Sequence, residues 1–112
     1  MQPKRLALLI RDLVLDKKAE DPVILDIAKL SNMSNYFVIV HGNSDPHVRA
    51  IAEHVQEELK AKKVRALHVE GVREGKWILL DYGSVILHVF YYQTREFYSL
   101  ESLWGHAKRV TD

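Results

Sequence analysis

Hydrophobic residues recur at two different spacings along this chain, and these spacings predict its helices and strands. Aliphatic residues between positions 6 and 14 follow the spacing of one helix face, and we expect this first helix to end before Asp21 and Pro22. Similar stripes at residues 48–59 and 97–107 predict a central and a final helix, the latter capped by Thr94. Short apolar runs predict five strands, at residues 23–28, 36–40, 64–69, 77–82 and 85–90.

The order of these elements predicts the fold class. The order is α-β-β-α-β-β-β-α, and only the central helix spans enough chain to connect two parallel strands. The short links elsewhere favour antiparallel neighbours. We therefore expect an α/β (α+β) fold in one domain spanning residues 1–112, with a mixed five-stranded sheet and three helices.

The last two predicted strands are apolar on both faces. Trp77 and Leu79 alternate with Ile78 and Leu80, and nearly all of residues 85–90 are apolar. Strands of this kind are usually covered on both faces of the sheet, yet three helices cover one face of five strands well and hardly both. Either the helices divide between the faces, or part of one face stays bare until a partner covers it. The hydrophobic pattern by itself favours neither arrangement.

Composition and charge exclude several classes of protein. Sixteen Lys and Arg residues against fifteen Asp and Glu give a net charge of +1, so nucleic acid is not expected as the main partner. The absence of cysteine excludes disulfides and thiolate metal sites. The apolar run after Lys4 and Arg5 is broken at Arg11, which is too early for a signal peptide, and no run is long enough to span a membrane. We therefore expect a cytoplasmic protein.

Candidate catalytic and metal-binding residues are poorly arranged for chemistry. Ser44 lies between a strand and a helix, like the nucleophilic serine of the G-x-S-x-G motif in hydrolases. Pro46 replaces the last glycine of that motif, and a helix N-cap explains the segment more simply. Nucleotidyl transfer with two metal ions needs paired carboxylates, whereas Asp26 and Asp81 stand singly on separate strands. The six histidines lack the local spacing of metal ligands. We expect no catalytic residue and no metal site.

An ordered set of segments is similar to the ribosomal silencing factor family, also called Iojap-related. The segments that match are residues 36–39, 42–45, 47–52, 69–71, 77–83, 85–90 and 98–104. They cover nearly the whole chain in the family's order. Ser84 departs from the pattern, because many members carry an acidic residue after the preceding glycine.

This resemblance implies a fold like that of nucleotidyltransferases without their catalytic carboxylates, and hence a protein that is not an enzyme and needs no cofactor. It implies binding to the fourteenth protein of the large ribosomal subunit, which blocks joining of the small subunit and slows translation when nutrients are scarce. Any contact with ribosomal RNA is then incidental. A weak homodimer that covers the bare face is also expected. The alternative is a small nucleotide-binding or nucleotidyl-transfer enzyme on the same fold.

The resemblance also implies that the partner binds the hairpin of residues 77–90, which favours the bare-face arrangement. Aromatic residues dominate the binding energy of interfaces, and acidic groups orient a basic partner such as a ribosomal protein. The partner-binding residues that we predict are Glu70, Trp77, Leu79, Asp81, Tyr82, His88 and Phe90.

Overall fold

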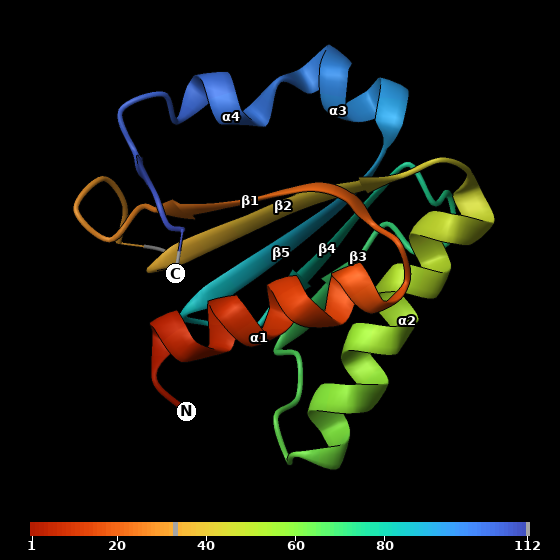
Figure 1. Ribbon diagram of the computed structural model, residues 1–112, viewed down its shortest axis with the longest axis horizontal. Helices are drawn as coiled ribbons and strands as arrows, with labels where there is room; N and C mark the ends of the chain where they lie inside the picture. Colours follow the sequence, from red (N-terminus) through yellow and green to blue (C-terminus); the bar gives the residue numbers. More distant parts are fainter. Residues whose placement is uncertain (33, 112) are drawn as a thin grey trace.

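The computed structural model describes residues 1–32 and 34–111, in which helices lie on both faces of one mixed sheet (Figure 1). In chain order the elements are α1 (Pro3–Asp16), β1 (Glu20–Asp26), β2 (Tyr36–Gly42), α2 (Asp45–Ala61), β3 (His68–Glu70), β4 (Trp77–Asp81), β5 (Val85–Tyr91), α3 (Tyr92–Tyr98), α4 (Leu100–Leu103) and β6 (Lys108–Arg109). The α+β class predicted from the sequence is confirmed.

The sheet has the strand order β3-β4-β5-β2-β1-β6 within the described residues. Strands β2 and β5 run parallel, with Tyr36 beside Val85 and Gly42 beside Tyr91, and the other neighbouring pairs are antiparallel. A parallel pair needs a long connection, and this one contains α2. The sequence prediction that the central helix lies between parallel strands is therefore confirmed.

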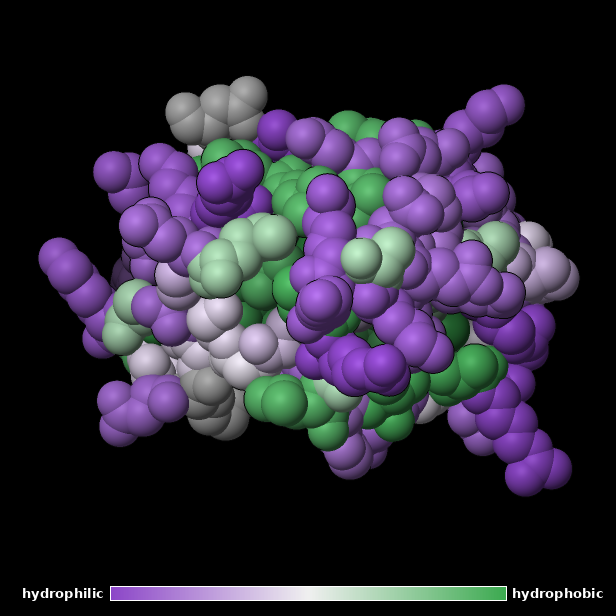
Figure 2. Space-filling model, turned by 90° about the horizontal axis from the view of Figure 1, so that it is seen from below, coloured by the Kyte–Doolittle hydropathy of each residue, from purple (hydrophilic) through white to green (hydrophobic). Residues whose placement is uncertain are grey.

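Two hydrophobic cores lie on opposite sides of the sheet. Helices α1 and α2 cover one face, where Ile10 and Val55 pack with Val38 and Leu87 (Figure 1). The outer surface of this side is dominated by hydrophilic residues (Figure 2). Segment α3–α4 lies across the other face, and Leu100 belongs to the core there. The helices thus divide between the faces, as one of the two predicted arrangements has it, and of the bare face that the other arrangement predicted only the β3–β4 end is left open by α3–α4.

The start of α2 matches its predicted cap. The backbone N–H of His47 donates to Ser44 Oγ at 3.2 Å, and Pro46 lies in the first turn of the helix. Ser44 is therefore used as a helix cap.

The strands differ from the prediction at the edges of the sheet. A sixth strand, β6, pairs two residues with Leu25 and Asp26, and a segment that short gives no periodic signal in a sequence. The predicted third strand shrinks to three exposed residues, because Val64 instead donates to the carbonyl of Leu59 and closes the end of α2. Strand β1 begins earlier than predicted, with an irregular register between Glu20 and Val23.

The predicted final helix is two short helices. Ser99 adopts a left-handed backbone with a φ of 48°, which ends α3 before α4 begins. Thr94 lies inside α3 and does not cap it. Because the helical spacing does not continue through the break, Phe97 and Leu103 are 81% and 76% exposed, although we predicted them on the apolar stripe.

Arg95 anchors this segment to the rest of the fold. Its side chain is buried, and its guanidinium donates to Glu101 Oε2 at 3.1 Å, to the Asp21 carbonyl at 2.8 Å and to His41 Nδ1 at 2.9 Å. These bonds join α3 to α4, to the start of β1 and to β2. The position of α3–α4 over the sheet therefore depends on one buried cation with several partners.

Candidate docking surface

The uncovered end of the second sheet face is built by β3 and β4. Alternation places Trp77, Leu79 and Asp81 on this face, and the register puts Glu70 of β3 beside Leu79. All three β4 side chains are half-buried, unlike their neighbours on β5. A hollow of about 360 Å³ lies here, lined by Glu70, Gly71, Trp77 and Leu79. Four of the predicted partner-binding residues, Glu70, Trp77, Leu79 and Asp81, thus lie together; we call them the docking surface.

Trp77 is held on three sides. Its indole N–H donates to His88 Nδ1 at 3.1 Å. Its ring centroid lies 4.9 Å from that of Phe90 and 5.0 Å from that of Tyr98 on α3. An aromatic side chain that is fixed before binding loses little conformational freedom in a complex, which is what an interface anchor requires.

His88 and Phe90 lie beside the docking surface on the neighbouring strand β5, where Phe90 pairs with Trp77 and His88 with Leu79. Phe90 is fully buried, and His88 is 4% exposed. Burial lowers the pKa of His88 to about 4, so the imidazole is neutral at pH 7. Both residues were predicted to touch a partner; the structure instead buries them on β5, where their rings pack beside the Trp77 indole.

Tyr82 lies on the opposite side of the sheet. It belongs to the core beneath α1 and α2, and its hydroxyl is buried without a partner in the described residues. Burial raises the pKa of Tyr82 to about 12, so the phenol remains protonated at pH 7. The structure therefore does not bring Tyr82 together with the other predicted residues, because it follows Asp81 with the opposite parity.

The docking surface has an acidic rim. The carboxylate of Glu70 lies 3.1 Å from the ring nitrogen of His68 in an exposed pair. Asp81 Oδ1 accepts a hydrogen bond of 2.7 Å from the backbone N–H of Gly83, which fixes the turn into β5. An apolar centre with carboxylates at its edge is complementary to a basic partner.

The loop that leads into Trp77 is braced by α2. Arg49 donates from Nε to the carbonyl of Val72 at 3.0 Å and from Nη2 to that of Arg73 at 2.9 Å. Lys76 Nζ lies 2.9 Å from Asp45 and 4.3 Å from the centroid of the Tyr91 ring. Sequence reasoning missed Arg49 because its partners are backbone carbonyls, which no residue pattern identifies.

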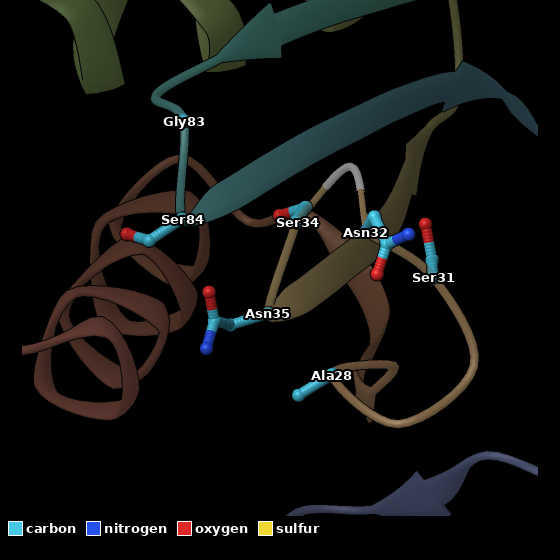
Figure 3. Close-up of a pocket in the computed structure, with 7 residues that line it drawn as sticks. All are labelled: Ala28, Ser31, Asn32, Ser34, Asn35, Gly83 and Ser84. Carbon is cyan, nitrogen blue, oxygen red and sulfur yellow. The ribbon is translucent and has the colours of Figure 1, made fainter.

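A second hollow, of about 260 Å³, lies at the other end of the parallel pair (Figure 3). Serine and asparagine side chains of the β1–β2 loop line it together with Gly83 and Ser84 of the β4–β5 turn. No titratable side chain is among the described lining residues. This hollow therefore offers neither a general base nor a carboxylate ligand.

The two strand aspartates are too far apart to share metal ions. Asp26 is on β1 and Asp81 on β4, three strand spacings away, or about 14 Å. Two-metal sites hold their ions about 4 Å apart. Each carboxylate also accepts a backbone bond, from Ala28 and Gly83 respectively. Among residues 1–32 and 34–111, no cluster of three or more potential metal ligands occurs.

The histidines on α2 have structural partners. His47 Nδ1 accepts from the Asn43 N–H at 3.0 Å, and its Nε2 lies 2.7 Å from the Lys17 carbonyl. His54 pairs with Asp16 on α1 at 3.2 Å. Both residues therefore tie α2 to α1 and its C-terminal end.

No helix in the described part of the chain is long and apolar enough to cross a membrane.

The architecture is that of a solved α+β protein. A crystal structure of a protein from Chromobacterium violaceum superposes with a TM-score of 0.91 at 33% identity, covering 94% of this chain and 88% of that one. The fold and the docking surface together define the class of protein, which is an α+β protein whose sheet has one open end with aromatic and acidic residues.

Residues 1–112 match the family described as ribosomal silencing factor during starvation, RsfS. The chain is 42% identical to the ribosomal silencing factor RsfS of Bacillus subtilis over 92 residues, which are 82% of this chain and 78% of that protein. It is 30% identical over 95 residues, 82% of this chain, to the mouse protein named mitochondrial assembly of ribosomal large subunit protein 1, of which it covers 42%. The chain belongs to the ribosomal silencing factor family, which confirms the resemblance noted in the sequence.

Proposed function

We propose that this protein binds the large ribosomal subunit, through its fourteenth protein, and sterically blocks joining of the small subunit. Family membership supports a ribosomal role, and the name of the mouse relative refers to the large subunit. The observation that carries the proposal is the docking surface, where the fixed indole of Trp77 and the side chain of Leu79 have the carboxylates of Glu70 and Asp81 at their edge. Such a surface is complementary to a basic protein.

Steric blocking needs no reaction. The protein only has to bind the large subunit tightly enough that the small subunit cannot displace it, so binding energy alone determines the effect. We therefore propose that the protein is not an enzyme and uses no cofactor. The net charge of +1 favours a protein partner, with ribosomal RNA touched incidentally. A partner of this kind places the protein wherever ribosomes are assembled and used, and we expect the cytoplasm.

The experiment that tests the proposal is co-sedimentation with isolated large subunits. Removing a central aromatic anchor costs ~2–4 kcal/mol, or about 30- to 1,000-fold in affinity. Trp77→Ala is therefore expected to abolish co-sedimentation and to restore subunit joining in a translation assay. Lys62→Ala and Lys63→Ala, at the end of α2, are expected to bind normally.

Circular dichroism must show that the Trp77→Ala protein is folded, since a half-buried tryptophan also contributes to the core. A folded Trp77→Ala protein that binds normally, while the lysine variants fail, would move the binding surface to the basic end of α2. Magnesium-dependent nucleotide transfer that is lost in Asp81→Ala would instead favour the enzyme.

A further inference from the structure

We propose that His88 is a positioning residue. As a neutral imidazole with its proton on Nε2, it fixes the Trp77 indole in the orientation that docks on the ribosomal partner. The effect on docking rests on the proposed function, whereas the fixing of the indole is a property of the free protein. His88 is buried beside the docking surface, on the neighbouring strand, and acts on a partner only through Trp77.

The hydrogen bond to Trp77 determines the protonation state of His88. An indole N–H is only a donor, so Nδ1 of His88, 3.1 Å away, must accept and carries no proton. Burial disfavours the charged imidazolium, so the single remaining proton is on Nε2. Only one of the three protonation states of His88 is therefore compatible with this arrangement.

His88 is a poor choice if its only role is to fill the core. Its Nε2 is buried and has no hydrogen-bond partner among the described residues. Leaving a buried N–H unpaired lowers stability. The surrounding groups are apolar, with the Phe37 ring 4.7 Å and the Phe90 ring 6.3 Å from the imidazole. An apolar ring would satisfy packing better, so the feature that histidine alone supplies is the acceptor for Trp77.

The neighbours of Trp77 do not replace this bond. The rings of Phe90 and Tyr98 pack against the indole in tilted arrangements, but ring contacts tolerate rotation better than a directed hydrogen bond does. Strand pairing explains how His88 reaches the indole, since it lies opposite Leu79, one step along the same face from Trp77. His88 on β5 thus fixes Trp77, the interface anchor carried by the neighbouring strand β4.

The first test uses the free protein. Nitrogen-15 NMR is expected to show an unprotonated, accepting Nδ1 and a protonated Nε2 for His88. The Trp77 indole N–H is expected to be protected from solvent exchange, and a Trp104→Phe variant assigns the two indole signals. A His88 ring with its proton on Nδ1, or a Trp77 N–H that exchanges like that of a free indole, would overturn the inference.

Two substitutions separate positioning from packing. His88→Phe keeps an aromatic ring but removes the acceptor, so the Trp77 signal is expected to lose its protection while the melting temperature stays level or rises. His88→Asn leaves a void but can place its amide oxygen near the position of Nδ1. It is therefore expected to melt lower, yet to keep the indole signal. If both variants keep the signal, or if its loss simply follows the loss of stability, His88 is a packing residue.

Binding to large subunits is then compared across the same variants. We expect His88→Phe to bind about 2- to 10-fold more weakly, the effect of freeing one side chain at an interface. His88→Asn is expected to recover most of that loss. His54→Phe, on the opposite side of the sheet, is the matched control and is expected to change neither the indole signal nor binding. Wild-type protein that fails to bind would refute the proposed function, while the NMR result would still decide whether His88 fixes Trp77.

Discussion

Arg49 on α2 donates a hydrogen bond of 3.0 Å from Nε to the carbonyl oxygen of Val72, a residue 23 positions further along the chain. A second bond reaches the neighbouring carbonyl of Arg73. The helix on one face of the sheet thereby holds the loop that leads to the docking surface on the other. A residue that contacts no partner is thus tied to the geometry of the surface.

Arg49→Met is expected to loosen this loop without unfolding the protein. Methionine retains most of the aliphatic length but donates no hydrogen bonds, so the amides of residues 72–76 should exchange faster with solvent. Arg73→Met is the control, since it keeps the backbone carbonyl that Arg49 binds. Hydrogen exchange measured by mass spectrometry compares the two; equal protection in both variants would show that Arg49 does not brace the loop.

Gly71→Ala is expected to disturb the docking surface more than Gly83→Ala does. Both glycines have a positive φ, of 83° and 82°, which costs an alanine about 1–2 kcal/mol. A Cβ on Gly71 would also lie 1.9 Å from the carbonyl oxygen of Trp77, whereas at Gly83 the nearest atom is a flexible Leu67 methyl at 3.3 Å. Urea unfolding of both variants isolates the steric contribution. Similar losses of unfolding free energy in the two variants would contradict a steric contribution at Gly71.

The protein is expected to lose stability in mild acid through His88. The folded pKa of about 4 lies below the ordinary value of 6.5, so the unfolded chain binds the proton first as pH falls. The free energy of unfolding should therefore decrease between about pH 6.5 and pH 4, by about 3 kcal/mol in total. Urea titrations at several pH values measure this slope, and His88→Phe should flatten it. An unchanged slope in that variant would assign the acid sensitivity to other groups.

Arg95→Met is expected to destabilise the protein strongly. It removes a buried cation and leaves the carboxylate of Glu101 and the carbonyl of Asp21 without their donor. Breaking a fully buried charge pair from one side costs about 3–5 kcal/mol, and the loss here is expected near or below the lower end of that range, because the Glu101 side chain is 26% exposed. Lys62→Met, at an exposed position, is the control. A loss below about 1 kcal/mol in chemical unfolding would mean that α3–α4 is held by packing alone.

A weak homodimer is expected when no ribosome is present. The docking surface exposes part of Trp77 and Leu79, and Phe97 on α3 is almost fully exposed. Apolar groups of this kind favour self-association, and a symmetric dimer is the commonest form. Light scattering over a concentration series measures the mass. A protein that stays monomeric at millimolar concentration would refute the dimer.

The parts of the fold that follow periodic patterns were predictable. The helical spacing of α2 and its Ser44 cap are local properties, and the alternation of Trp77, Leu79 and Asp81 fixes which side chains share a face. The same alternation gives Tyr82 the opposite face, a consequence that the resemblance to the family concealed.

The remaining differences depend on tertiary contacts. Arg95 is buried because Glu101, Asp21 and His41 converge on it from separate elements. The left-handed Ser99 breaks a helix whose apolar spacing seemed continuous, which exposes Phe97 and Leu103. The pattern of a single segment contains no information about such partners, so charge and hydrophobicity alone place these residues on the wrong side.

The parallel pairing of β2 with β5 has a consequence for how the protein folds during its synthesis. Tyr36 lies beside Val85, and all of α2, β3 and β4 lies between them in the chain. Pairings this distant in sequence form late, because a long loop must close first. Within residues 1–32 and 34–111, β3 and β4 are joined to the other strands of the sheet through β5. A nascent chain therefore has no complete docking surface until β5 has been synthesised, so a protein proposed to act on ribosomes can bind them only after residues 85–91 have been made.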